Sequence, residues 1–237
     1  MRSLPRGINR TKIEWCDCTW NPITGCTNGC PYCYARRIAE RFRGTPSFPS
    51  GFEPTIHVDR LTAPFYLKEK GRKIFVCSMG ELYADNYENW TYEVLRTVKK
   101  CPDQTFITLT KQSQNLNRWS PFPDNCWVGV SVTCEDELLT ACAELASVVA
   151  PVKFLSLEPL LKWDKHTQMD WFGTALALGR ISWIIIGAQT QPYRPPSKES
   201  VLEIFHATDN ESVALFLKDN LKPLLGVDSL RQEWPIV

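Results

Sequence analysis

The sequence predicts an α/β fold built on a mostly parallel sheet. The 237-residue chain contains recurring apolar runs that are nearly continuous instead of alternating, which is typical of parallel strands covered on both faces. Segments with helical patterns lie between these runs, and strand–helix alternation implies parallel βαβ units with right-handed crossovers. We expect either a doubly wound sheet or a closed or partial barrel, with function at the carboxyl ends of the strands.

Eight segments are predicted to be extended. An early strand is expected over residues 18–22, directly ahead of a group of cysteines, and a short extended segment over 54–58. The main strands are expected in six apolar, β-rich runs: residues 73–79, 105–110, 126–132, 152–157, 181–188 and 212–218.

Four helices are predicted, over residues 31–42, 89–101, 135–149 and 195–207. Pro196 and Ser197 form a helix start signal for the last of them, and acidic residues open the third, as the helix dipole favours. Two of the helices carry an apolar stripe that should face the core. These stripes are Val94, Leu95, Val98 and Cys101 in the second helix, and Leu138, Leu139, Cys142, Leu145 and Val149 in the third.

Length and composition indicate one globular domain over residues 1–237, with a Pro/Gly/Ser-rich surface loop over 42–54 and a C-terminal strand and tail over 211–237. Hydrophobic residues make up 43% of the chain and charged residues 22%, which are ordinary globular values. The N-terminus lacks the apolar core of a signal peptide, and no apolar run approaches the roughly 20 residues needed to span a bilayer. We therefore expect a cytoplasmic protein without a membrane partner, whose ten cysteines stay reduced.

Three cysteines, Cys26, Cys30 and Cys33, fall in the loop 25–35 at a C-x3-C-x2-C spacing. Thiolates suit zinc and iron–sulfur clusters, and both kinds of site usually take four protein ligands. Three ligands would leave one iron of a [4Fe-4S] cluster open to a substrate or cofactor. The alternative is a closed zinc or cluster site that takes Cys16 or Cys18 as its fourth ligand.

The spacing, with Tyr32 before the last cysteine, resembles the signature of the radical S-adenosylmethionine (SAM) superfamily. The resemblance implies a partial (β/α)6 barrel, with a [4Fe-4S] cluster on Cys26, Cys30 and Cys33 and SAM on the open iron. It also implies an enzyme that reductively cleaves SAM to a 5′-deoxyadenosyl radical, with the hard chemistry carried by the cofactors.

Later strand ends extend the resemblance. The stretch "CSMGEL" is similar to the family's segment for the SAM amino group, and it places Ser78, Gly80 and Glu81 there. Lys111 after "TLT" could pair with the SAM carboxylate, and Ser131 in "GVSVT" could bind the ribose; Thr133 could do the same or cap the following helix. Glu158 after "FLSL" is expected to contact SAM or substrate.

The set Ser78, Lys111 and Ser131 resembles that of spore photoproduct lyase, and the motifs along nearly the whole chain resemble a phage- and prophage-associated branch grouped with that enzyme. The resemblance implies a lyase or base-modification activity. It also makes Cys77 a candidate hydrogen donor, although a buried strand cysteine is the plainer interpretation.

A nucleic-acid or nucleoside substrate is expected from the arginines at positions 36, 37, 41 and 43 and from nine tryptophans, since basic and aromatic groups together hold unstacked nucleotides. A net charge of +1 argues against nonspecific long-range attraction. Substrate contacts are expected from Gln189, Tyr193 and Arg194, where a Gly-Glu-Ser-Gly pattern would be usual, and from Lys218.

The reductant should be an external flavodoxin or ferredoxin, since no flavin or nicotinamide motif is visible. Two alternatives remain: a radical SAM enzyme acting on a peptide or small metabolite, and a non-catalytic, metal-stabilised nucleic-acid-binding module. The absence of a second C-x2-C argues against the first, and a closed zinc site would identify the second.

Overall fold

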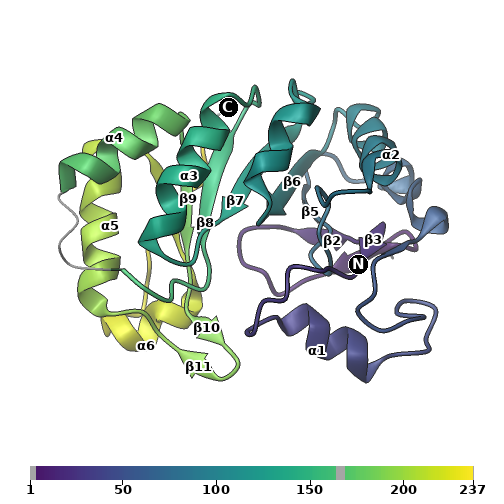
Figure 1. Cartoon of the computed structure of the whole chain (residues 1–237), viewed down its shortest axis with the longest axis horizontal. Coiled ribbons are helices and arrows are strands. Elements are labelled where there is room, and N and C mark those ends of the chain that lie inside the picture. The colour runs from purple at the N-terminus through teal and green to yellow at the C-terminus, as the bar shows by residue number, and fades with distance from the viewer. Residues whose placement is uncertain (1–3, 164–168, 237) are drawn as a thin grey trace. The chain divides into compact units, whose positions relative to one another are not determined.

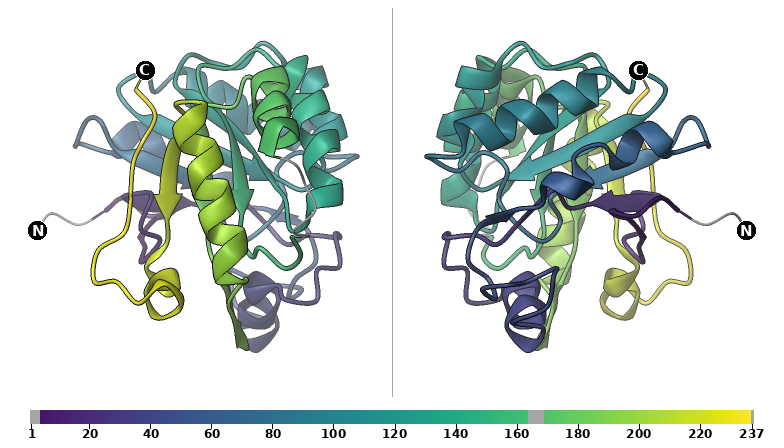
Figure 2. Two further views of the ribbon diagram at one scale, coloured as in Figure 1. Left: turned by 90° about the vertical axis from the view of Figure 1, so that its left-hand side faces the viewer. Right: turned by 90° about the vertical axis from the view of Figure 1, so that its right-hand side faces the viewer.

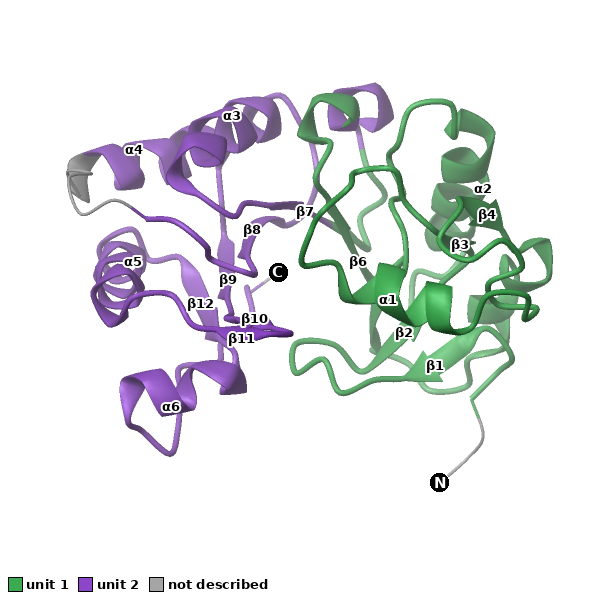
Figure 3. Cartoon of the chain, turned by 60° about the horizontal axis from the view of Figure 1, so that its bottom comes forward, with its two compact units in different colours: residues 1–115, 122–127 green, residues 116–121, 128–237 purple. Residues whose placement is uncertain are grey.

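A computed structural model describes residues 4–163 and 169–236, and the side chains of residues 169 and 170 are left out of the description. The chain forms two compact units (Figure 3). The first comprises residues 1–115 and 122–127, and the second residues 116–121 and 128–237. Eight main strands are divided between them, and all but the first run parallel to their neighbours within a unit.

The first unit is built on the strand order β1-β2-β5-β6. Strand β1 (Ile8–Arg10) is antiparallel to β2 (Cys18–Trp20), and β5 (Lys73–Val76) and β6 (Thr105–Thr110) follow in parallel. A separate antiparallel pair joins β3 (Ile23–Thr24) to β4 (Thr55–Ile56). Two helices belong to this unit: α1 (Tyr34–Arg41) and α2 (Glu88–Lys99).

The second unit continues from β7 (Cys126–Ser131), whose first two residues belong to the first unit. Its order is β7-β8-β9-β12, with β8 (Lys153–Leu157), β9 (Trp183–Ile186) and β12 (Ala214–Leu217). The crossover helices α3 (Glu135–Ala146), α4 (Met169–Gly179) and α5 (Lys198–Asn210) lie side by side (Figure 1). Figure 2 shows α5 running alongside β12.

Smaller elements complete the described chain. A hairpin of β10 (Gln189–Thr190) and β11 (Tyr193–Arg194) follows β9, and α6 (Lys222–Leu225) follows β12. Short 3-10 helices lie at Val58–Arg60, Ala63–Tyr66, Ser113–Trp119 and Asp219–Leu221. No helix among the described residues is long and apolar enough to cross a membrane.

Every predicted strand is present, and several are shorter than expected. Strand β5 ends at Val76 instead of residue 79 because Cys77 takes a positive φ of 55°, a conformation that ends regular extended structure. The four predicted helices are also present, and α5 is capped by Ser197 as its start signal indicated, with the Oγ accepting from the backbone N of Ser200 at 3.0 Å.

Two details of the predicted helices are wrong. In the third predicted helix, Leu138, Cys142 and Leu145 are buried, but Leu139 and Val149 are 46% and 64% exposed. Val149 lies beyond the end of α3, where the helical periodicity no longer applies. The prediction also omitted α4 altogether.

Candidate functional site

The cysteine loop begins where β3 ends. The backbone N of Cys26 donates to the carbonyl of Phe52 at 3.2 Å, and the N of Cys33 donates to the carbonyl of Cys30 at 3.3 Å. Cys33 is the N-cap of α1, and its Sγ accepts from the backbone N of Arg36 at 3.4 Å. A sulfur at this position faces the N–H groups of the first helical turn, which have no partner within the helix.

Two glycines join this loop to the carboxyl end of β5. Gly25 and Gly80 form a parallel bridge, in which the N of Gly25 donates to Met79 at 2.9 Å and the N of Glu81 donates to Gly25 at 3.2 Å. A Cβ on Gly80 would lie 2.9 Å from the Gly25 carbonyl oxygen. The close approach of the two backbones therefore depends on the glycine at position 80, which gives Gly80 a structural reason to be there.

Glu81 is only 3% exposed and lies at the centre of this region. Its Oε1 accepts from the N of Tyr83 and the Oγ1 of Thr110 at 3.1 and 2.7 Å. Its Oε2 accepts from the Nδ2 of Asn28 and the N of Lys111 at 3.1 and 3.2 Å. Burial raises the pKa of this carboxyl, although its hydrogen bonds act in the opposite direction.

Four donors saturate the acceptor sites of a carboxylate. This favours a role for Glu81 in joining the cysteine loop to the ends of β5 and β6 over the direct cofactor contact expected from the sequence.

Tyr32 lies in the cysteine loop, and Ser78 and Lys111 lie close to it in the first unit. The Lys111 Nζ lies 5.5 Å from the centre of the Tyr32 ring. Burial raises the pKa of the Tyr32 hydroxyl; the neighbouring Lys111 acts to lower it and the thiol of Cys30 to raise it. Ser78 donates its Oγ to the Oδ1 of Asn21 at 3.1 Å, and its carbonyl accepts from the hydroxyl of Tyr34 at 2.7 Å. The structure thus brings three predicted cofactor contacts close to the cysteines.

The donor set of the loop fits an iron–sulfur cluster. Burial, with smaller contributions from Glu81 and the thiols of Cys30 and Cys33, raises the pKa of the Cys26 thiol to about 11, although the hydrogen bond from the backbone N of Asn28 acts to lower it. Iron would offset this penalty, because a metal-bound thiol is deprotonated outright. The backbone N of Asn28 already donates to the Cys26 Sγ at 3.3 Å.

Among the described residues, no group of three His, Cys, Asp or Glu side chains converges as a single metal ion would require. A cubane cluster has no such requirement, since each cysteine binds a different iron.

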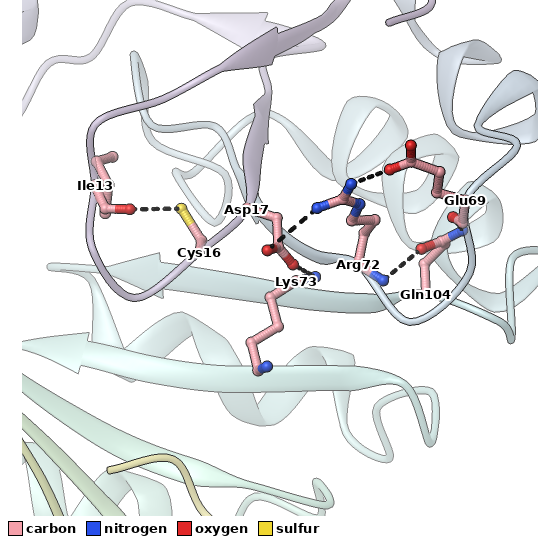
Figure 4. Close-up of polar contacts among 7 residues, drawn as sticks. All are labelled: Ile13, Cys16, Asp17, Glu69, Arg72, Lys73 and Gln104. Carbon is pink, nitrogen blue, oxygen red and sulfur yellow. Dashed lines mark hydrogen bonds and ion pairs between the residues drawn. The ribbon is translucent and has the colours of Figure 1, made fainter. Parts of the chain in front are cut away.

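Cys16 and Cys18 lie at the amino end of β2, away from the cysteine loop. Cys18 pairs with Ile74 at the start of β5, and the chain then runs along β2 towards the cysteine loop. Two residues of strand span about 7 Å, and the loop lies further on. The Cys16 Sγ donates to the carbonyl of Ile13 at 3.9 Å (Figure 4).

Polar contacts fix this amino end of the unit. Asp17 accepts from the N of Lys73 at 2.7 Å and from the Nη1 of Arg72 at 3.5 Å, and Arg72 also pairs with Glu69. The Oε1 of Gln104 accepts from the N of Arg72 at 2.9 Å. Because the segment is tied down here, the geometry disfavours Cys16 or Cys18 as a fourth ligand for the loop.

Cys77 is 4% exposed, and burial raises the pKa of its thiol to about 12. A hydrogen-atom donor must reach its radical acceptor, so this burial argues against the donor role and favours the plainer interpretation of a buried cysteine.

In the second unit, Glu158, Gly187 and Lys218 follow the ends of three adjacent strands. Leu157 of β8 and Leu217 of β12 both pair with Ile186 of β9, so these three residues lie in line. Glu158 and Lys218 form an ion pair with side chains 25% and 12% exposed. A Cβ on Gly187 would lie 3.0 Å from Lys218 Cδ and 3.1 Å from Glu158 Cγ. The absence of a side chain at Gly187 therefore leaves space for the Glu158–Lys218 ion pair. This ion pair was not predicted from the sequence.

The remaining predicted contacts also lie in the second unit. Ser131 ends β7 and is half-buried, opposite Ser156 of β8. Thr133 is not the N-cap of α3, which is Cys134; its N and Oγ1 instead donate to the Oε2 of Glu137, at 2.6 and 3.0 Å.

The β10–β11 hairpin shows which of its side chains are available. Gln189 is 9% exposed and donates to the carbonyl of Pro192 at 3.0 Å, which favours a structural role. Tyr193 is 47% exposed and donates to the carbonyl of Asn220 at 3.0 Å. Arg194 is exposed, so Tyr193 and Arg194 remain the accessible candidates for substrate contact.

Sequence reasoning missed Asn21, Asn28 and Gln112. The Oδ1 of Asn21 accepts from the Oγ of Ser78 and from the backbone N of Met79, two residues that follow the end of β5. Gln112 donates its Nε2 to the Oδ1 of Asn28 at 2.7 Å. The available signal was position: each is an amide side chain at the end of a strand or inside the cysteine loop.

Among solved structures, the fold of this chain is similar to that of spore photoproduct lyase. One point mutant of that enzyme superposes with a TM-score of 0.58 at 10% identity, over 90% of this chain and 80% of the other. A second, with dinucleoside spore photoproduct, gives 0.53 at 11% identity, over 87% of this chain and 65% of the other. At identities this low, the superposition shows only that the two proteins share a mixed α/β fold. The phage association predicted from the sequence stays a prediction.

No curated protein matches the chain. Residues 10–222 match a family model described as "Protein of unknown function (DUF5131)". The match covers most of the chain, and the chain therefore belongs to the DUF5131 family.

Proposed function

We propose that this protein is a radical SAM enzyme with a single [4Fe-4S] cluster on Cys26, Cys30 and Cys33. The observation that carries the proposal is that these three thiols share one loop at the carboxyl ends of β5 and β6, while Cys16 and Cys18 lie at the amino ends. The fold shared with spore photoproduct lyase, a radical SAM enzyme, supports it. A partial barrel is the arrangement that we expect of the strands.

When bound, the cluster and SAM would supply reductive cleavage of the cofactor to a 5′-deoxyadenosyl radical. The chain's own residues bind and orient. Lys111 holds a positive charge beside the loop for a carboxylate, and Tyr32 fixes that ammonium group over its ring. Ser78 offers a half-buried hydroxyl at the same strand end. Contacts from Ser131 and Glu158 of the second unit rest on the sequence pattern alone.

The proposed substrate is a nucleic acid or nucleoside, which would supply a hydrogen atom to the chemistry of the bound cofactors. Exposed arginines on α1 support this, because Arg36, Arg37 and Arg41 follow directly after the cluster ligands, and Arg36 lies 5.4 Å from the ring centre of Phe52. One of the lyase structures contains a dinucleoside photoproduct, which favours the same substrate class. The reductant is an external flavodoxin or ferredoxin.

The test is anaerobic reconstitution with iron and sulfide, followed by SAM and dithionite. We expect 5′-deoxyadenosine from the wild type and from Cys16→Ser, and none from Cys30→Ala. Cys16→Ser is the matched control, because it removes a nearby thiol that the proposal leaves unliganded.

Tetrahedral zinc at one ion per chain, with no SAM cleavage, would instead identify the metal-stabilised binding module. A further outcome is SAM cleavage that is unaffected by nucleic acids and nucleosides but stimulated by a peptide or small metabolite. That result would show that the substrate belongs to the second class.

A further inference from the structure

We propose that Asn28 is a positioning residue that holds the cysteine loop in its ligand-binding arrangement before any metal binds. The inference rests on the proposed function only in taking the loop as the cluster site. Asn28 lies between Cys26 and Cys30 and makes three contacts. Its N donates to the Cys26 Sγ at 3.3 Å, its Nδ2 donates to the Glu81 Oε2 at 3.1 Å, and its Oδ1 accepts from the Gln112 Nε2 at 2.7 Å.

Glu81 and Gln112, the two partners of the Asn28 side chain, are each held in place by further hydrogen bonds. Glu81 is buried and accepts from three other donors. The backbone N of Gln112 donates to the Oγ1 of Thr110 at 2.9 Å, and its Oε1 accepts from the Nδ2 of Asn115 at 3.1 Å. The Asn28 side chain thereby adds a second attachment to the Gly25–Gly80 bridge and links the loop to the end of β6 as well.

The hydrogen-bond direction along this chain of amides is determined from both ends. At one end the Asn115 Nδ2 donates to the carbonyl of Tyr83 at 2.9 Å, and a carbonyl can only accept. At the other end the Glu81 carboxylate also only accepts. Rotating either amide by 180° would set oxygen against oxygen and nitrogen against nitrogen. The Asn28 side chain therefore has one satisfied orientation, and its backbone is held with its N–H towards Cys26.

The consequence is a preorganised loop. Gly29, next to Asn28, has a φ of +71° and open space around its Cα, so the loop has little intrinsic stiffness. Ordering a free backbone costs conformational entropy at every residue, and the metal would have to supply that free energy. Removing side chains that support metal ligands typically weakens metal affinity about 10–100-fold.

The experiment is hydrogen exchange of the metal-free protein, read by mass spectrometry over residues 25–33. In Asn28→Ala we expect these amides to exchange about 10-fold faster or more, because the loop loses both side-chain anchors. Thr27→Ala is the matched control: Thr27 is the exposed neighbour in the same loop, and its removal should leave exchange unchanged. If Asn28→Ala does not fold, Gln112→Ala cuts the same contact from the other side.

A pair of variants separates positioning from general loss of stability. Asn28→Asp keeps the size of the side chain and its acceptor towards Gln112, but it places a carboxylate against that of Glu81, and we expect it to loosen the loop as Asn28→Ala does. In both variants the amides of the buried strand β9 should exchange at the wild-type rate, because the loss is local to the loop. After reconstitution, Asn28→Ala should lose iron to a chelator about 10–100-fold faster than the wild type.

Loop amides of Asn28→Ala that exchange at the wild-type rate, or that accelerate no more than the amides of β9, would overturn the inference. The two proposals fail separately. The loop can be protected in the wild type and exchange faster in Asn28→Ala even though the protein takes up no iron. That result would support the positioning role of Asn28 and overturn only the proposed cluster.

Discussion

At the scale of single residues, burial divides the cysteines into two classes. Cys30 and Cys33 are half-buried, whereas Cys77 and Cys126 are 4% and 0% exposed, and burial raises the pKa of each of these two thiols to about 12. Because the thiolate is the nucleophile, a raised pKa and closed surroundings both slow alkylation near pH 8.

We expect iodoacetamide to label Cys30 and Cys33 of the metal-free protein at least ~10-fold faster than Cys77 and Cys126, as mass spectrometry can measure. Loading the cluster should protect Cys30 and Cys33. Labelling of Cys77 as fast as Cys33 would contradict the buried position and reopen its role as hydrogen donor.

His57 gives the fold a predicted pH dependence. It is 7% exposed and lies 2.9 Å from the Thr24 Oγ1, and burial, followed by the charge of Arg60, lowers its pKa from 6.5 to about 4. The unfolded chain therefore takes up a proton below pH 6.5 that the folded chain refuses until about pH 4. The free energy of unfolding should fall across this window as the pH falls.

Between pH 7 and pH 5 this loss should amount to about 1–2 kcal/mol, measured by chemical denaturation. His57→Gln should remove that share of the pH dependence, whereas His206→Gln, at an exposed position of α5, should keep it. An unchanged pH dependence in His57→Gln would show that His57 titrates normally.

Sequence and structure agree unevenly at this scale. The three loop cysteines could be found from spacing because they lie within eight residues. The position of Asn28 inside the loop made it a candidate, but its contacts could not be predicted, because its partners Glu81 and Gln112 lie 53 and 84 residues away. The Glu158–Lys218 pair was missed for the same reason, being separated by 60 residues.

At the scale of elements, the cysteine loop is attached to β5 through glycine. Gly25 has a φ of +87°, and a Cβ there would lie 2.3 Å from the carbonyl oxygen of Glu53. Gly44 has nearly the same φ, +86°, with nothing within 4 Å. The two positions therefore share a backbone penalty and differ in the clash.

We expect Gly44→Ala to lower the free energy of unfolding by about 1–2 kcal/mol, and Gly25→Ala by a further 1–3 kcal/mol or so because backbone must move. Denaturant titration of both variants measures the difference. Equal losses would mean that the loop does not pass close to residue 53.

Apolar runs predicted the strands well because parallel strands are buried on both faces. Helix α4 was missed because its eleven residues include Gly173 and Gly179, which weaken a helical pattern, and because its apolar residues lead directly into β9. Strand β5 was drawn too long because nothing in "CSM" shows that Cys77 adopts a positive φ.

At the scale of the whole molecule, the chain combines the mixed α/β fold of spore photoproduct lyase with a loop of three cysteines at strand ends. The alternation of strands and helices was sufficient to predict that class of fold. The division into two compact units was not visible in the sequence, because one boundary falls inside strand β7, between residues 127 and 128. Partial barrel closure remains a prediction.

The central claim is that the protein leaves one iron of its cluster without a ligand of its own. Mössbauer spectroscopy of the ⁵⁷Fe-reconstituted protein, with and without SAM, tests it most directly. We predict that SAM shifts the signal of one iron site in the cubane and leaves the other three unchanged. A spectrum that SAM does not alter, from a cluster whose four irons all carry protein ligands, would contradict the account.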